Sequence, residues 1–396
     1  MDILRRNFRQ LDFTLIGMMV LLAAYGCLVL LAVTYGKPTA PNGTVPPHVL
    51  TKQIAFEVLG IIMMLVMTIV DYQVLRKYSW WVYGVTLFLL LAVYAMPKVA
   101  GAHSWIPLGP LEFQPSELMK LALIVVVARL MADNDEAELP DYRFIKTWPM
   151  WLLVLVPFGL VYKEPALGQA LVIFAIFMTL LAAYVKRSQF IVLSLIMVIV
   201  IGGITVAAVQ YPHQATYFLT HNFLVKHKII HQFQLERIIT WLNPNTALNG
   251  NGYAVHYSQM AIGSGQIFGE GLFNGIETSG GWVPNQWTDY IFTGIGEEFG
   301  FVGASVLVLM FLVVFYRMTR IAATARDTFG TYIVIGIVGM FAFQVFENIG
   351  MDMYLSPATG ITLPFVSYGG SSLIIDYMAI GIALSVAVRK KRLRFN

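Results

Sequence analysis

The sequence predicts an all-α polytopic membrane protein with ten transmembrane helices, both termini in the cytoplasm and a large extracellular loop between helices 7 and 8. Hydrophobic residues make up 58% of the chain and charged residues 12%, and the mean hydropathy is +0.69, a composition that excludes an ordinary soluble domain. The apolar residues recur in runs of roughly 15–25 residues, the length that crosses a ~30 Å hydrocarbon core as a helix. These runs are continuously apolar without period-2 alternation, which favours helices over a β-barrel.

Each of the ten runs is interpreted as one span of a single integral membrane domain that covers residues 1–396. The spans lie near residues 11–35, 53–70, 80–96, 115–132, 148–162, 170–184, 190–209, 289–316, 331–350 and 371–388. The first run is too long for the apolar core of a signal peptide, so we expect it to be retained. The single cysteine, Cys27, excludes an intrachain disulfide.

The distribution of Lys and Arg predicts the orientation of these spans. Basic residues gather in every second connecting segment, whereas the alternate short segments hold only Lys37, Lys52, Lys98 and Lys163. Such a bias places the basic segments and both termini in the cytoplasm. The outward-facing segments are then residues 36–52, 97–114, 163–169, 210–288 and 351–370. The net charge of +4 is too small to suggest nucleic-acid binding.

The first candidate group of polar residues begins the fourth predicted span. Glu117 and Lys120 follow Pro115-Ser116 and lie three residues apart, on one face of a helix. One interpretation is a neutralised ion pair that joins helices. The other is the charged floor of a functional site, because charges inside a membrane are costly and usually functional.

The second candidate is Asp289, at the end of the long polar stretch 210–288 and at the edge of the next predicted span. Asp289 suits a helix N-cap, and its neighbours Trp287 and Tyr290 suit the aromatic belt of a membrane interface. A carboxyl group at such an interface can also act as an acid or base whose pKa is tuned by partial loss of water. Deeper in the same span, Glu297 and Glu298 need partners that the sequence does not identify.

Three further outward-facing groups are candidates for binding a substrate. Glu164 lies in the short 163–169 loop, where a solvated acid is the ordinary alternative. Arg237 is suited to clamp a phosphate, although a helix-surface ion pair with Glu236 is the more frequent role. Segment 356–372 is rich in Gly and Ser, and such non-helical backbone at membrane depth must be buried in protein or line a wet cavity. Its N–H groups and hydroxyls suit phosphate oxygens, and the candidates are Ser367, Gly369, Gly370 and Ser371.

Metal binding has weak support in the sequence. His227 and His231 lie four residues apart in the long loop, but no Glu lies between them as in zinc proteases, so we expect a surface helix. We therefore predict no metal-ligating residues and no certain cofactor, and leave open whether a divalent cation such as Mg or Mn assists.

Four motifs occur in one order along the chain. They are Gln114-Pro115-Ser116-Glu117-Leu118 with Lys120, Ala261-Ile262-Gly263-Ser264-Gly265 with Gly269-Glu270-Gly271-Leu272, Thr288-Asp289-Tyr290-Ile291-Phe292 with Glu297-Glu298-Phe299-Gly300, and the Gly/Ser-rich stretch 359–372. Together they resemble the SEDS family of bacterial cell-wall glycosyltransferases over nearly the whole chain, and its RodA branch more than FtsW or SpoVE. The chain departs from the family at Ser104, where Arg is common, and at Ala166, where Asp is common, so neither position receives a role.

The resemblance implies polymerisation of lipid II into glycan strands on the outer face of the cytoplasmic membrane, during cell elongation. It implies lipid II as acceptor, a glycan on undecaprenyl pyrophosphate as donor, and a class B penicillin-binding protein as partner. Asp289 would be the general base, Lys120 and Arg237 would stabilise the departing pyrophosphate, and Glu117 would position Lys120.

Two alternatives to this enzyme remain, a lipid II flippase and a scaffold that activates the penicillin-binding protein. A flippase should also present polar groups at the middle of the membrane, whereas the candidate groups of this chain gather on one side. We therefore expect the enzyme.

Overall fold

The computed structural model describes residues 11–35, 48–96, 104–108, 111–137, 147–164, 166–210, 232–242 and 251–390. Within these ranges a long helix lies at each of the ten predicted positions. The helices are α2 Phe13–Thr34, α3 Val49–Ile69, α4 Tyr72–Ala92, α5 Pro115–Glu136, α6 Trp148–Lys163, α7 Leu167–Tyr184, α8 Arg187–Gln210, α14 Ile291–Ala323, α15 Thr328–Asp352 and α16 Gly370–Val388. The predicted all-helical polytopic membrane class is confirmed.

The helices differ in how clearly they are membrane spans. Among the described residues, seven are long and apolar enough to cross a membrane, namely α2, α3, α4, α7, α14, α15 and α16. The 16-residue α6 and the first part of α8 are shorter apolar segments. Helix α5 is not among these seven because it carries Glu117 and Lys120 near its start and Asp133 and Glu136 near its end, which lower its hydropathy.

The prediction for α4 was wrong at its start, which lies at Tyr72 instead of residue 80. The Asp71 carboxylate accepts a hydrogen bond from Gln73 N at 2.9 Å and caps the helix. The next turns are polar, so a search for apolar runs excludes them from the span. A 3₁₀ turn, η1 Val93–Ala95, extends this helix at its other end.

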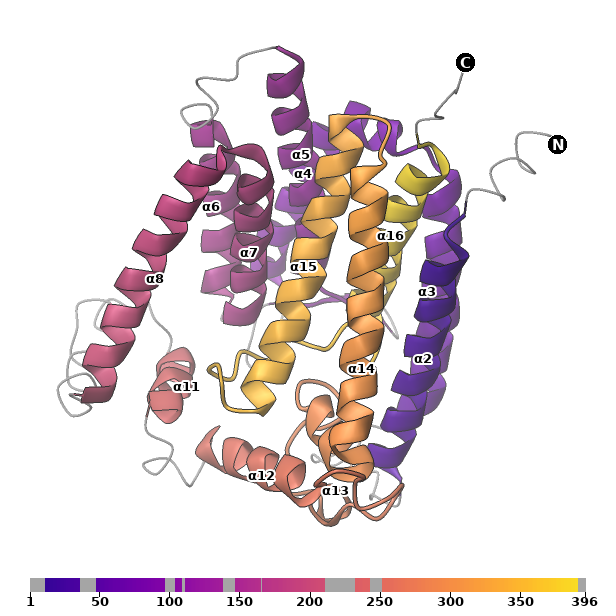
Figure 1. Ribbon diagram of the computed structural model, residues 1–396, viewed down its shortest axis with the longest axis vertical. Coiled ribbons are helices and arrows are strands. Elements are labelled where there is room, and N and C mark those ends of the chain that lie inside the picture. Colours follow the sequence, from indigo (N-terminus) through magenta and orange to yellow (C-terminus); the bar gives the residue numbers. More distant parts are fainter. Residues whose placement is uncertain are drawn as a thin grey trace.

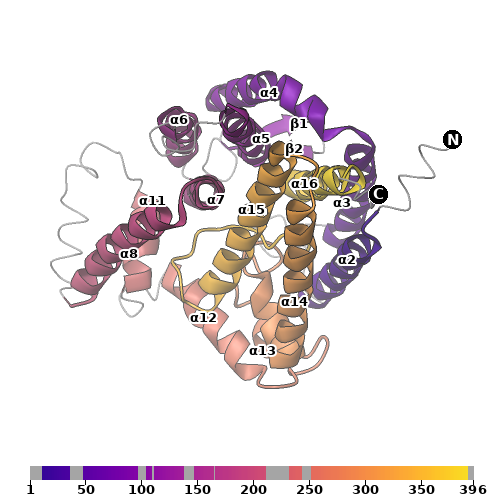
Figure 2. The ribbon, with the colours of Figure 1, turned by 45° about the horizontal axis from the view of Figure 1, so that its top comes forward.

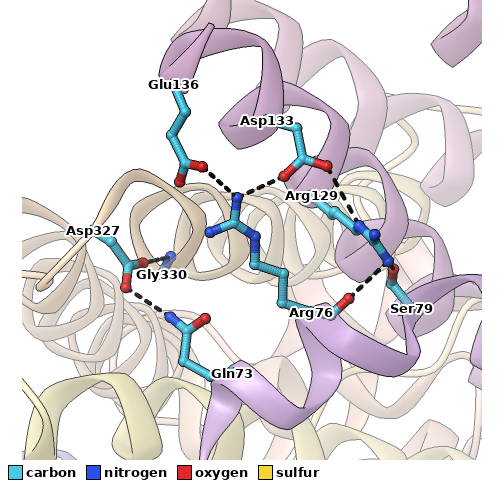
Figure 3. Close-up of polar contacts among 8 residues, drawn as sticks. All are labelled: Gln73, Arg76, Ser79, Arg129, Asp133, Glu136, Asp327 and Gly330. Carbon is cyan, nitrogen blue, oxygen red and sulfur yellow. Dashed lines mark hydrogen bonds and ion pairs between the residues drawn. The ribbon is translucent and has the colours of Figure 1, made fainter.

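Polar contacts tie three helices together at the end of the bundle that the charge bias assigns to the cytoplasm, here called the inner end (Figure 3). The Arg76 guanidinium of α4 pairs with Asp133 at 2.6 Å and Glu136 at 2.9 Å, both on α5. Asp327 caps α15 through Gly330 N and accepts a bond from Gln73 of α4. Partly exposed ion pairs contribute about 0–1 kcal/mol each, so these contacts mainly set how the helix ends align.

The interior of the bundle is apolar and closely packed around α15 and α16. Helix α15 packs against α5, α7 and α14, and α16 packs against α3 (Figure 2). Small residues allow the closest approach: a Cβ on Gly381 of α16 would lie 2.5 Å from Met64 O of α3. Small residues at helix crossings are the usual means of close packing in membranes. This packing fixes the position of the α16 N-terminus, which reaches the site described below.

At the opposite, outer end, short elements cover the bundle. They are α11 Gln232–Leu242, α12 Asn251–Ser264, α13 Ile276–Gly280 and the antiparallel hairpin of β1 Ile106–Leu108 and β2 Leu111–Phe113. Helices α12 and α13 lie below α14 and α15 in Figure 1. The predicted loop 210–288 therefore contains three helices in its described parts.

Candidate active site

A cavity of about 580 Å³ opens at the outer end, between α3, α5, α7 and the N-terminus of α16. The side of the cavity near α3 includes Lys52 and Phe56, and the hairpin contributes Glu112. Glu117, Gly168 and Gln169 come from α5 and α7, and the remaining lining comes mainly from residues 285–289, 359–362 and 368–372. Five segments far apart in the sequence thus meet around one polar space.

Three consecutive backbone carbonyls hold Asp289 at this cavity. Trp287 O accepts a hydrogen bond from Tyr368 N at 2.9 Å, and Thr288 O accepts one from Ser367 Oγ at 2.6 Å. Asp289 O accepts one from Asn348 Nδ2 at 2.6 Å. Because each carbonyl before α14 has a partner, the Asp289 side chain is held toward the cavity without depending on its own hydrogen bonds.

Asn348 is a buried residue that the sequence analysis did not identify. Its Nδ2 also donates to Ile361 O at 2.8 Å, so one amide joins the segment that carries Asp289 to the segment that carries Gly360. An Asn inside an apolar helix indicates that some polar contact is made. The sequence does not indicate that the partners are Asp289 O and Ile361 O.

The Asp289 carboxylate and the Arg237 guanidinium of α11 meet beside Gly360. A Cβ on Gly360 would lie 3.3 Å from Asp289 Oδ2 and 3.4 Å from an Arg237 guanidinium nitrogen, and Gly360 has φ +75°. Glycine satisfies both constraints here, the positive φ and the close approach. Burial raises the pKa of Asp289, and the charge of Arg237 partly opposes this rise. The neighbouring Glu236 is exposed.

Glu117 and Lys120 form a buried ion pair below the cavity. Lys120 Nζ lies 2.6 Å from Glu117 Oε2, and the side chains are 0% and 1% exposed. Gln169 Nε2 of α7 donates to Glu117 Oε1 at 2.6 Å, and the buried Asp376 of α16 interacts electrostatically with both charges. Glu117 lines the cavity and Lys120 is not among the lining residues. Both interpretations of this pair therefore fit the structure. The pair connects α5 to α7 and α16, and Glu117 lines the cavity.

The Gly/Ser-rich segment contains two kinds of residue: serines whose hydroxyls bind backbone groups of neighbouring segments, and residues that line the cavity. Besides its bond to Thr288 O, Ser367 Oγ accepts from Leu363 N at 2.9 Å. Ser371 Oγ accepts from Gln114 N at 3.3 Å, which connects α16 to the start of α5. Gly369, Gly370 and Ser372 line the cavity at the N-terminus of α16. The two glycines, rather than Ser367 and Ser371, are therefore placed to approach a substrate.

Glu164 is buried at the end of α6 and does not line the cavity. Its backbone carbonyl accepts a hydrogen bond from Ser104 Oγ at 3.2 Å. Ser104, which stands where the family commonly has Arg, therefore holds the end of α6. Ala166, the other departure, lines the cavity. Burial raises the pKa of Glu164 from 4.5 to about 8.

This raised pKa predicts a pH-dependent stability. The folded chain keeps the Glu164 proton where the unfolded chain has lost it, so stability falls as pH rises from about 5 to about 8, by up to about 1.4 kcal/mol per pH unit. We expect Glu164→Gln to remove this part of the decline, as measured by melting temperature across that range. Glu236→Gln, on the exposed surface, should keep the decline. An unchanged slope in Glu164→Gln would disprove the assignment.

Glu297 and Glu298 have structural partners. Glu297 accepts bonds from Glu277 N at 2.6 Å and Thr278 Oγ1 at 2.6 Å, which holds α13 against α14. Glu298 Oε2 accepts from Phe273 N at 3.1 Å. The backbone carbonyls of both acids accept from the loop between α12 and α13, where α14 kinks at Gly300, φ +64°. These contacts connect the second motif of the chain to the third.

Metal ligands were not predicted, and within the described ranges no three His, Cys, Asp or Glu side chains gather as a metal site. His227 and His231 lie outside the described residues. The expectation about Mg or Mn therefore stays open.

Fold and site together define a multi-pass membrane protein with a polar cavity at its outer end, which is lined by the Asp289 carboxylate and Gly360. The Arg237 guanidinium lies next to Gly360 but is not among the lining residues. A family model described as "Cell cycle protein", for FtsW, RodA and SpoVE, matches residues 12–392. The chain belongs to this family.

Relatives and a solved structure are similar over nearly the whole chain. A probable peptidoglycan glycosyltransferase FtsW of Trichlorobacter lovleyi is 33% identical over 99% of this chain and 97% of its own length. The peptidoglycan glycosyltransferase MrdB of Escherichia coli is 29% identical over 97% of this chain and 95% of its own length. A solved chain from a peptidoglycan synthase complex that coordinates polymerization and crosslinking has a TM-score of 0.74 and 26% identity, with 95% and 97% of the two chains covered.

Proposed function

We propose a specific reaction for this chain, which is a peptidoglycan glycosyltransferase. The 4-hydroxyl of the GlcNAc of lipid II attacks the anomeric carbon of the donor MurNAc, and Asp289 takes the hydroxyl proton. The new glycosidic bond forms with inversion while the bond to the lipid pyrophosphate breaks. Undecaprenyl pyrophosphate leaves with the bonding electron pair, and the glycan is then carried by the acceptor lipid.

The observation that carries this proposal is the meeting of Asp289 and Arg237 beside Gly360. A general base needs a carboxylate whose pKa is brought toward the working pH, and burial of Asp289 has this effect. The departing pyrophosphate needs a fixed positive charge, and the Arg237 guanidinium is suited to bind it bidentately. Lys120 is less suited, because it is fully buried and already paired with Glu117. We therefore assign the leaving-group role to Arg237 and a supporting role to Lys120.

The distribution of buried charges also favours the enzyme over a flippase. In the described part of the chain, the buried charged side chains of the membrane helices lie in the outer halves of those helices, including Glu57 in α3, Glu347 in α15 and Asp376 in α16. A transport path for a charged headgroup would need charged side chains through the inner half as well.

The test is a reaction of the purified chain with labelled lipid II, alone, with an intact class B penicillin-binding protein, and with the same partner after its own active site is inactivated. We expect labelled glycan strands. Movement of lipid II across vesicle membranes without polymer would support a flippase, and polymerisation only with an intact partner site would support a scaffold.

The penicillin-binding partner and the elongation role are finer parts of the proposal. The solved relative belongs to a synthase complex, which supports the partner. The relative named FtsW is 33% identical, so overall identity does not single out the RodA branch. Depletion in the host distinguishes the roles: we expect rounded cells from a loss of elongation, whereas filaments would indicate division.

The pair Arg237–Asp289 predicts a shift in the pH dependence of polymerisation. Activity requires the Asp289 carboxylate and falls as pH drops through its pKa. Because Arg237 opposes the rise of that pKa, Arg237→Gln should raise it further and move the acid limb of the profile to higher pH. Arg237→Lys keeps the charge and should leave the limb near its original position. If the acid limb does not move in Arg237→Gln, the charge of Arg237 does not set the pKa of the group that acts as the base.

A further inference from the structure

A second cavity, of about 220 Å³, lies at the inner end of the bundle, far from the candidate active site. It lies where the start of α2, the end of α14 and the end of α16 meet, and these ends lie together at the top of Figure 1. Its lining is mainly polar and charged: Asp12, Arg317, Arg320, Thr324 and Lys390, with Ile321 as an apolar member.

The charges of this cavity do not balance. Asp12 is engaged by Arg317, whose guanidinium donates to both carboxylate oxygens at 2.6–3.1 Å. No carboxylate of the described residues pairs with Arg320 or Lys390, and both residues are exposed. The cavity therefore presents two cations beyond those that Asp12 neutralises, which suits an anion.

The surface of α14 next to the cavity indicates which kind of anion binds. Leu309, Leu312 and Tyr316 are exposed and are spaced three and four residues apart, so they form one stripe that leads to Arg320, four residues further on. The Arg320 guanidinium lies 3.3 Å from Tyr316 Oη and over the Tyr316 ring. An apolar stripe that ends in a tyrosine and a cation matches a molecule with an acyl chain and an anionic head.

We propose that this cavity binds the phosphodiester headgroup of an anionic phospholipid of the inner leaflet. Arg320 and Lys390 bind the phosphate, and an acyl chain follows α14 past Tyr316, Leu312 and Leu309. Basic pockets between transmembrane helices on the cytoplasmic side are suited to such headgroups. This site takes no part in the proposed reaction, so failure of one proposal leaves the other intact.

The test uses the full chain in neutral detergent with short-chain phosphatidylglycerol as the probe. We expect phosphatidylglycerol to raise the melting temperature to a saturating value, while phosphatidylcholine with the same chains and inorganic phosphate have no such effect. In the double variant Arg320→Gln/Lys390→Gln the dissociation constant should rise about thirtyfold. Arg320→Lys/Lys390→Arg keeps both charges and should bind like the unmodified chain.

The matched control is Arg326→Gln/Lys77→Gln, which removes two exposed inner-end cations that do not line the cavity. It should bind phosphatidylglycerol normally. Equal weakening in this control would mean general surface attraction and overturn the site. Equal stabilisation by phosphatidylcholine would overturn the anion requirement, and an equal effect of inorganic phosphate would overturn the lipid assignment.

Discussion

Replacing Asp289 with Asn should lower lipid II polymerisation by at least about a hundredfold, because a positioned general base contributes about 10²–10⁴ in rate. The amide cannot take the proton of the attacking hydroxyl. It has nearly the same shape, and the backbone carbonyls of residues 287–289 keep their partners, so the fold should not change. The measurement is the initial rate of glycan formation from labelled lipid II, with melting temperature as the check on folding.

Two controls sharpen this result. Glu236→Gln removes an exposed carboxylate of the same outer segment and should keep full activity. Asp289→Glu keeps the acid but moves it by one methylene from the position that the carboxylate holds beside Gly360 and Arg237, so it should recover only part of the activity. Normal polymerisation by Asp289→Asn would show that another group is the base.

Breaking the buried ion pair should have the largest effect on stability. Lys120→Met leaves the Glu117 carboxylate buried without its cation, and the loss of one member of a buried pair costs about 3–5 kcal/mol. Asp376 loses the same neighbouring charge, which adds to the effect. The melting temperature in detergent should therefore fall well below that of the unmodified chain.

The double variant Glu117→Gln/Lys120→Met removes both charges and should recover most of this loss. Arg76→Met, at the partly exposed inner-end pair, is the control and should cost about 1 kcal/mol or less. A Lys120→Met variant as stable as the control would contradict the structural role. Polymerisation by the stable double variant then separates the roles: retained activity means that the pair supports the fold, and lost activity means that its charge serves the reaction.

The candidate site illustrates which features were predictable. Asp289, Glu117 and Gly370 were identified because a polar or non-helical residue at a membrane boundary stands out from its surroundings, and all three line the cavity. Asn348 and Gln169 were missed, although they hold Asp289 O and Glu117 Oε1. Asn348 lies within α15 and Gln169 lies in the first turn of α7, and only the facing segments reveal what a neutral amide binds.

In the third and fourth motifs, the structure gives two polar residues partners that the sequence does not indicate. Glu297 lies inside a span, where an acid is costly, and the sequence does not identify its partner. In the structure it accepts bonds from Glu277 N and Thr278, so its cost is offset by holding α13. Similarly, Ser367 was a candidate for a phosphate and instead holds Thr288 O.

By itself the sequence determined the helical membrane class, the order and approximate positions of the ten helices, and the family, because length, hydropathy and motif order are properties of the chain alone. Only the tertiary structure decided which polar groups meet. Helices that are apolar on all sides mark no preferred face, so their rotation and partners follow from packing with one another. The meeting of Asp289 with Arg237, and of Glu117 with Gln169 and Lys120, depends on that packing.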